Sequence, residues 1–380
     1  MALIKMNKRI LYVTFLTVAL WSCGGNGNDP SPEDNGKDRQ VILTHWVDNI
    51  IIPAYANFKV KFDAMKVKGE AFTSAPNNTT LTEFRSAWVE AYLEWQKVEV
   101  FEFGPADQVT LRNFFNIYPA DVAGITSNIN DPSINLDLPA SYARQGFPAL
   151  DYLINGVGSD DAQIISFYTS GADAAKRIAY VKRITDRMNT LISDVISGWS
   201  TYRDTFISKT GLDIGSSFGN VVNAYVLYYE RYIRSGKIGI PSGSTVATGG
   251  AVNPDKVEAY YKKDISLALA KNAHAAAMDF FNGKNVNTGA EGPSFKSYLD
   301  ALGAKDATTG TMLSQIINDQ LTVITGHLNG LSPDLSQQVQ SNNQPVVDTY
   351  TAMQKLVRII KVDMTSAMSV TITYTDNDGD

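Results

Sequence analysis

Apolar residues recur every three or four positions along most of this chain, and this spacing limits the fold more than any other feature. The longest such stripe lies within residues 172–208 and consists of Val181, Ile184, Met188, Leu191, Val195, Trp199, Tyr202 and Phe206. Shorter stripes lie in residues 81–98, 313–328 and 346–364. Because this period matches one face of an α-helix, each segment predicts a helix that buries that face against a neighbour.

Strand signals are scarce in comparison. The alternating run Val370–Tyr374 is too short for more than an extended tail. We therefore expect an all-α fold of two antiparallel helical bundles packed side by side. The N-terminal bundle would span residues 39–210, and the C-terminal bundle would span residues 211–380 and end in that short extended tail.

Local signals predict where several helices begin and end. Thr80 and Glu83 have the spacing of a capping box at a helix start. Asn253-Pro254 predicts the start of an alanine-rich helix that ends near Asn282-Gly283. The glycine-rich segment 236–243 contains Lys237 but lacks the spacing of a phosphate loop, so we expect a structured bend there.

The N-terminus has the pattern of an export signal. Three cations at positions 5, 8 and 9 precede an apolar run over residues 10–20 that is short for a membrane span. The run ends in Leu-Trp-Ser-Cys-Gly at residues 20–24, which resembles a lipobox. We expect residues 1–22 to be a signal peptide and Cys23 to be lipidated. An ordinary secretory signal with an incidental cysteine is the alternative.

The rest of the composition agrees with an anchored envelope protein. Cys23 is the only cysteine, which excludes disulfides and thiolate metal sites from the body. Residues 23–38 are polar and glycine-rich, so they predict a flexible linker. Loss of the three signal-peptide cations changes the net charge from −6 to about −9, which argues against nucleic acid as a partner. The expected location is the cell envelope, at the periplasmic or surface face of the outer membrane. The expected attachment is through lipid on Cys23 and not through a membrane-spanning helix.

A few polar residues continue apolar helix faces. Glu99 follows Trp88, Tyr92 and Trp95 on one face, so its carboxylate is expected to point inward unless the helix ends there. Asn223, Glu230 and Arg234 share a face of a second helix, where an ion pair that positions helices is favoured over a catalytic acid.

The histidines give weaker signals. His45 and Asp48 lie one helical turn apart, a spacing that is common by chance in helices without a metal. His274 lies in an alanine-rich run, which favours a packed histidine. The chain contains no H-E-x-x-H or G-x-S-x-G motif.

Several segments together resemble the imelysin-like family, also called insulin-cleaving membrane proteases or peptidase M75, and its lipoprotein branch in Bacteroidetes. These segments are Trp95–Glu99, Phe103–Pro105, Asn116–Asp121, Gly146–Leu153, Asn220–Gly243 and Lys361–Asp380. The resemblance covers nearly all of the mature chain. It implies paired helical bundles with a pocket between them and a role linked to bacterial iron uptake.

The family hallmark G-x-H-x-x-E, proposed as a metal or catalytic site, is degenerate here. It aligns with Gly146, Pro148 and Asp151, so proline replaces the histidine and a shorter carboxylate replaces the glutamate. Proline offers no metal-binding side chain, and a lone carboxylate suits only hard cations. The peptidase activity that the family name implies is therefore in doubt for this chain.

These arguments favour a non-enzymatic envelope lipoprotein that binds an iron species or an iron-transport partner protein. The ligand-binding cleft would be lined by Trp95, Glu99, Asp121, Gly146, Pro148, Asp151, Asn223 and Glu230. Glu99 and Asp151 are the candidate ligands for iron or another hard cation. The sequence itself does not establish a cofactor. The alternatives are a metal-dependent peptidase and a glycan- or protein-binding module that uses the aromatic residues.

Overall fold

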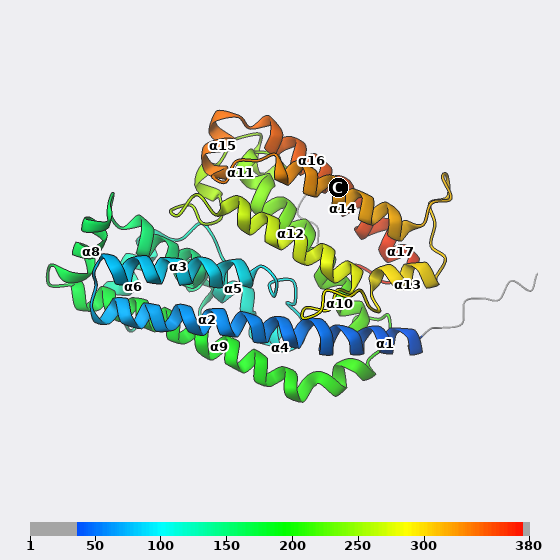
Figure 1. The fold of residues 1–380 in the computed structure, drawn as a ribbon, viewed down its shortest axis with the longest axis horizontal. Helices are drawn as coiled ribbons and strands as arrows, with labels where there is room; N and C mark the ends of the chain where they lie inside the picture. Colours follow the sequence, from blue (N-terminus) through cyan, green and yellow to red (C-terminus); the bar gives the residue numbers. More distant parts are fainter. Residues whose placement is uncertain (1–35, 375–380) are drawn as a thin grey trace, which may run out of the picture. The chain divides into compact units, whose positions relative to one another are not determined.

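A computed structural model describes residues 36–374 of the chain, and helices dominate it (Figure 1). The first half contains α1 (Gly36–Trp46), α2 (Ile52–Ser74), α3 (Asn78–Trp95), α4 (Pro105–Gln108), α5 (Leu111–Phe115), α6 (Val122–Asn130), α7 (Gly146–Asp151), α8 (Asp161–Thr169) and α9 (Ala174–Ser208). The second half contains α10 (Ser217–Leu227), α11 (Ile240–Ser242), α12 (Ser266–Asn282), α13 (Phe295–Ala301), α14 (Leu313–Asn329), α15 (Leu335–Ser341), α16 (Gln344–Arg358) and α17 (Thr365–Ala367).

Shorter helical segments of other types interrupt or extend these helices. The π-helical segments are η1 (Val47–Ile51), η3 (Tyr152–Gly156), η4 (Tyr228–Gly239) and η7 (Ile359–Met364). The 3₁₀ segments are η2 (Pro139–Arg144), η5 (Val246–Thr248) and η6 (Pro254–Lys256). Within residues 36–374 β-structure is limited to two isolated bridges. The all-α prediction is confirmed.

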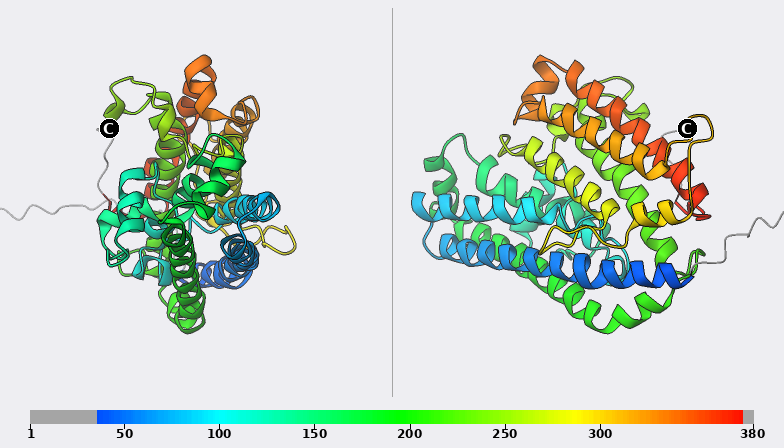
Figure 2. Two further views of the ribbon diagram at one scale, coloured as in Figure 1. Left: turned by 90° about the vertical axis from the view of Figure 1, so that its left-hand side faces the viewer. Right: turned by 45° about the vertical axis from the view of Figure 1, so that its right-hand side comes forward.

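The helices pack in two groups that α12 connects. In the first group α2 packs against both α3 and α9, and in the second α14 and η4 pack against α16. The yellow helix α12 contacts α3 on one side and α14 on the other, and it lies between these groups in both figures (Figure 1, Figure 2). The described residues belong to one compact unit, and the boundary near residue 210 stays a prediction.

The long stripes form the core as the periodicity predicts. In α9 the buried side chains include Val181, Ile184, Met188, Val195 and Trp199. Neighbours in this series are three, four or seven residues apart, so they lie on one helix face, which is the arrangement that places an apolar stripe against a neighbouring helix. No helix among residues 36–374 combines the length and apolarity that crossing a membrane requires.

Two predicted helix starts are wrong. The N-cap of α3 is Asn77, three residues before the predicted cap Thr80, because Asn77 Oδ1 accepts from the N–H of Thr79 and Thr80 while Thr80 Oγ1 accepts from the Asn77 N–H. The capping box therefore pairs Asn77 with Thr80. The sequence Asn253-Pro254 starts only the short segment η6, and α12 begins at Ser266.

The predicted bend at residues 236–243 is also wrong. Segment η4 continues as a π-helix to Gly239 and runs into α11, and the chain reverses only at Gly243, whose φ is +78°. A Cβ on Gly239 would lie 2.7 Å from a ring carbon of Tyr350. Glycine at 239 thus permits close packing of η4 against α16, which is a different use from the structured bend that we expected.

Candidate functional site

Glu99 lies in the core, just beyond the C-terminal end of α3. Its backbone N–H donates to the Trp95 carbonyl oxygen at 3.0 Å, so the chain makes one more turn before it leaves the helix. The residue is only 2% exposed. A buried carboxylate needs hydrogen-bond or charge partners, and these identify the polar centre of the molecule.

The partners of Glu99 come from distant parts of the chain. Its Oε1 accepts from Asn116 Nδ2 at 2.9 Å, and its Oε2 accepts from the Tyr228 hydroxyl at 3.3 Å. Asn116 Nδ2 also donates to Oε1 of Glu258 at 2.8 Å, while the side-chain Oδ1 of Asn116 accepts from the Tyr92 hydroxyl. One amide group therefore connects two buried carboxylates.

Lys237 supplies the positive charge between these two carboxylates. Its Nζ lies 2.5 Å from Glu258 Oε2 and 3.9 Å from Glu99 Oε2, and it donates to Gln96 Oε1 at 2.7 Å. Gln96 Nε2 donates in turn to Glu258 Oε1 at 3.1 Å. We call Gln96, Glu99, Asn116, Lys237 and Glu258 the buried polar network; all five are buried.

Tyrosine hydroxyls around the network remain protonated. Burial, and next the charge of Glu258, raises the pKa of Tyr92 and of Tyr118 well above the usual value. Burial and the charge of Glu99 do the same to the pKa of Tyr228. The Tyr92 and Tyr228 hydroxyls act as hydrogen-bond donors to a centre whose carboxylates are already paired with an ammonium group.

Asp151, the motif carboxylate, binds backbone N–H groups in the second half of segment 254–265. Its Oδ2 accepts from the Tyr261 N–H at 2.9 Å, and its Oδ1 accepts from the Lys262 N–H at 2.9 Å and from Asn155 Nδ2 at 3.0 Å. Asp151 is buried. It therefore fixes an irregular segment whose non-glycine residues Ala259 and Lys263 have positive φ angles.

The other two motif residues have packing roles. Pro148 is buried at the third position of α7, and Gly146 has a φ of +76°. A Cβ on Gly146 would lie 2.4 Å from the Phe115 carbonyl oxygen. The donor set at the motif therefore does not fit a tightly held metal, because Pro148 has no ligating atom and both Asp151 oxygens already accept hydrogen bonds.

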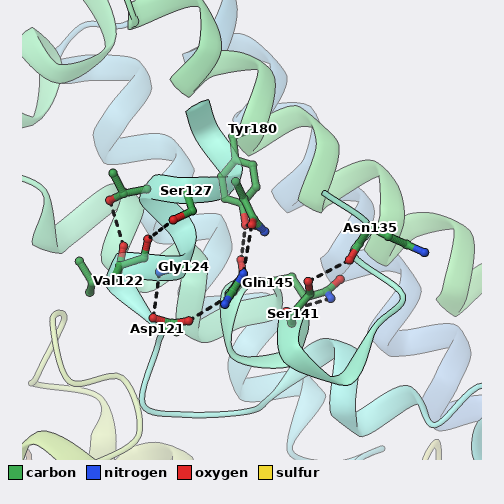
Figure 3. Close-up of polar contacts among 12 residues, drawn as sticks. Asp121, Val122, Gly124, Ser127, Asn135, Ser141, Gln145 and Tyr180 are labelled. Carbon is green, nitrogen blue, oxygen red and sulfur yellow. Dashed lines mark hydrogen bonds and ion pairs between the residues drawn. The ribbon is translucent and has the colours of Figure 1, made fainter. Parts of the chain in front are cut away.

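Asp121 lies in a third environment, at the start of α6 (Figure 3). Its Oδ1 accepts from the Gly124 N–H at 2.9 Å, which caps the helix, and its Oδ2 lies 2.9 Å from Arg144 Nε. Among the residues that the structure describes, no hydrogen bond or ion pair links Glu99, Asp121 and Asp151 to one another. Each carboxylate has partners of its own.

Asn223 and Glu230 face the C-terminal end of the described chain. Asn223 Oδ1 accepts from the Thr373 N–H at 2.8 Å, and its Nδ2 donates to the Thr371 carbonyl oxygen at 3.0 Å. Glu230 lies 2.9 Å from Lys361 Nζ and accepts from the Tyr374 hydroxyl at 2.6 Å. Both residues therefore fasten the extended tail to η4 and α10.

Trp95 packs in the aromatic core. Its ring stacks on Phe115 with centroids 4.7 Å apart, and Phe58 contacts it edge-on at 5.5 Å. Its backbone carbonyl oxygen accepts hydrogen bonds from the N–H groups of Val98 and Glu99. Trp95 thus supports the position of Glu99 from within the core.

The histidines have ordinary partners. His45 Nε2 lies 2.8 Å from the Gly283 carbonyl oxygen, and Asp48 makes a two-pronged contact with Arg203. His274 is buried and hydrogen-bonded to the Tyr229 hydroxyl, as a packed histidine would be. Within residues 36–374, no group of three or more His, Cys, Asp or Glu side chains could hold a metal ion.

Two hollows flank the segment that Asp151 holds. One of about 220 Å³ is lined by residues that include Tyr118, Pro148, Asp151 and Tyr260. The other, of about 640 Å³, lies between α3 and residues 261–265. Tyr261 lines both, so the anchored segment forms a wall between them.

The sequence did not point to Lys237 and Glu258 as site residues. Lys237 was visible only as a lysine in a glycine-rich segment, and Glu258 lies in an irregular stretch without periodicity. The buried inward position of Glu99, in contrast, follows from its place on the α3 stripe.

The raised pKa of Asp151 predicts that the free energy of unfolding depends on pH. Burial raises its pKa to about 7 from an ordinary 3.8, although the Tyr261 N–H, the Asn155 amide and the Lys262 N–H act in the opposite direction. Between these values the folded form holds a proton that the unfolded chain has lost, so stability falls as pH rises, by roughly 1.4 kcal/mol per unit. Urea unfolding at pH 5 and pH 7 should show a loss of about 2 kcal/mol from this group.

The matched variant for that measurement is Asp151→Asn, which cannot titrate. Its unfolding free energy should depend less on pH than that of the parent chain, whatever its absolute stability. Asp121→Asn, which removes a half-exposed carboxylate elsewhere, is the control. Equal pH slopes for the parent and Asp151→Asn would show that Asp151 is ionised throughout this range.

Comparison with known proteins gives consistent matches. A family model described as imelysin (peptidase M75) matches residues 51–361. Iron-regulated protein A of Synechococcus elongatus is 26% identical over 120 residues, which are 30% of this chain and 33% of that protein. The chain thus matches about a third of the length of this curated relative.

Two crystal structures share the fold. An imelysin-like protein from Psychrobacter arcticum has a TM-score of 0.66 at 18% identity and covers 89% of this chain and 98% of its own. A protein from Parabacteroides distasonis, described as an iron-regulated protein A precursor, has a TM-score of 0.69 at 17% identity and covers 88% of this chain and 96% of its own. At these identities the structures establish the fold alone. Since the family model spans most of the sequence, the chain belongs to the imelysin family.

Proposed function

We propose that this protein is a lipid-anchored envelope protein of bacterial iron uptake that acts by binding an iron species or a partner protein and not by catalysis. Three findings support the iron-related part: the family match, a relative named iron-regulated protein A, and a structural neighbour described in the same words. The lipobox-like residues 20–24 support the anchored location; they lie outside the described residues.

The observation that carries the binding role is the state of the carboxylates. Glu99 and Glu258 share Lys237, and Asp151 accepts two backbone N–H groups. A peptidase of the metal-dependent kind needs ligands that hold the metal and a base that activates its water. Each candidate acid here already has a structural partner, which favours recognition over hydrolysis.

The test is iron accumulation in a strain that lacks the gene. We expect lower uptake of radioactive iron under iron limitation, with recovery when the full chain is supplied. Unchanged uptake in the deletion strain would contradict the iron-related role. Cleavage of unfolded peptides by the purified protein, abolished by a chelator, would contradict the non-enzymatic part.

Loss of the anchor has its own prediction. Cys23→Ala removes the only thiol that could carry lipid, so the protein should move from the membrane fraction to the soluble envelope fraction. Fractionation with labelling by a radioactive fatty acid measures this change. The nearby Asn26→Ala is the control and should stay labelled and membrane-bound; a Cys23→Ala protein that remains in the membrane would contradict the lipid anchor.

A further inference from the structure

We propose that the 640 Å³ hollow between α3 and residues 261–265 binds a small organic polyanion, a molecule with at least two carboxylates on a carbon skeleton. The inference rests on the proposed function, since it names the chemical class of the bound species. Such anions bind iron through their oxygen atoms, so they can reach the site free or as an iron chelate.

The size of the hollow fits a small ligand. Its volume of about 640 Å³ lies within the roughly 300–1,000 Å³ that is typical of small-molecule sites. The neighbouring hollow beside Asp151, at about 220 Å³, is below that range. The larger hollow is therefore the better candidate of the two.

Arg85 provides a fixed cationic group on one wall. Its Nε donates to the Ile154 carbonyl oxygen at 2.8 Å, and its Nη1 lies 2.7 Å from Asp161, whose side chain is 50% exposed. Among the described residues, Arg85 Nη2 has no hydrogen-bond partner. Because Nε and Nη1 are both engaged, the guanidinium is held in place, and its Nη2 is left to donate to an incoming carboxylate.

Lys262 provides the second cation from the facing wall. Asp151 holds its backbone N–H at 2.9 Å, while its Nζ pairs with Asp264, whose side chain is 63% exposed. Exposed ion pairs of this kind contribute little to stability, so an incoming anion competes readily with Asp264 for the Lys262 ammonium. The one acid in the lining, Glu90, is paired with Lys61 at 2.9 Å.

The remaining lining suits a carbon skeleton. Val89 of α3 and Ile265 face the hollow together with the ring of Tyr261. The Tyr261 backbone is held by Asp151, and its ring lies 5.2 Å from that of Tyr152. An apolar surface between the two cations favours binding of an organic acid, whose carbon skeleton it can contact, over binding of a bare inorganic anion.

Calorimetric titration of the mature chain tests the proposal, with citrate and ferric citrate as probes. We expect binding of at least one form, at least tenfold weaker in Arg85→Gln/Lys262→Gln and weaker as salt rises. Lys68→Gln/Lys296→Gln removes two exposed cations away from the hollow and should bind as the parent does. The relative affinity of the two forms tells whether the free acid or the chelate is preferred.

The proposal would be overturned by the absence of heat with either form, by equal affinity in the Arg85/Lys262 variant, or by equal binding of uncharged trimethyl citrate. Displacement of citrate by equimolar inorganic phosphate would also overturn it. Thermal unfolding checks that the Arg85→Gln/Lys262→Gln variant is folded. If it is not folded, Lys262→Gln alone replaces it in the titration. If neither citrate nor ferric citrate bound but the deletion strain still took up less iron, this ligand class would be rejected and the proposed function would stand.

Discussion

Replacing Lys237 by methionine should lower the free energy of unfolding by about 3–5 kcal/mol. The substitution keeps an unbranched side chain as far as Cε but removes the ammonium that lies 2.5 Å from Glu258 Oε2 and 3.9 Å from Glu99 Oε2. Asn116 still donates to both carboxylates, yet one amide cannot offset two buried negative charges. Urea unfolding followed by circular dichroism measures the loss.

Two further variants separate the lost charge from lost packing. Glu258→Gln in the Lys237→Met background removes one of the two buried carboxylates that have lost their cation, and it should recover part of the stability. Lys61→Met breaks the exposed pair with Glu90 and should cost much less than Lys237→Met, because water screens this pair. If Lys237→Met cost no more than Lys61→Met, the buried polar network would not stabilise the fold.

The helices could be predicted because their signal is local. The apolar pattern that predicts α9 lies entirely within residues 172–208, and the observed helix is Ala174–Ser208. The alanine-rich helix ends at Asn282 as predicted, because Gly283 adopts a φ of +67° that ends α12. Errors arose where two side chains offered equivalent caps, as Asn77 and Thr80 did.

The buried polar network could not be predicted in this way. Its members come from the end of α3, from residue 116, from η4 and from an irregular segment near residue 258, so no spacing in the sequence connects them. Lys237 is buried because η4 continues as a π-helix where glycines suggested a bend. Only the tertiary structure brings Lys237 between Glu99 and Glu258.

The family motif shows the same limit for single residues. The sequence identified Gly146, Pro148 and Asp151 as a degenerate metal motif, but not what each residue does instead. Asp151 now holds the N–H groups of the segment that separates two hollows, and Gly146 permits close backbone packing. Both roles depend on contacts with residues far away in the sequence.

Gly146→Ala should therefore be one of the most damaging small substitutions in the chain, at about 2–5 kcal/mol. Part of this cost is conformational, since a φ of +76° is unfavourable for any residue with a Cβ. The larger part is steric: the new Cβ would lie 2.4 Å from the Phe115 carbonyl oxygen and 2.7 Å from that of Phe114, and backbone atoms cannot move aside cheaply. Thermal and urea unfolding measure the sum.

Gly171 offers a control that isolates the conformational part. Its φ of +82° is close to that of Gly146, but no atom lies within 4 Å of the Cβ that alanine would add. Gly171→Ala should therefore cost only about 1–2 kcal/mol. The difference between the two variants measures the clash with α5, and equal losses would mean that Gly146 is needed for its backbone angle alone. A clear excess at Gly146 would show that the first motif position is kept as glycine by packing, with no ligand required.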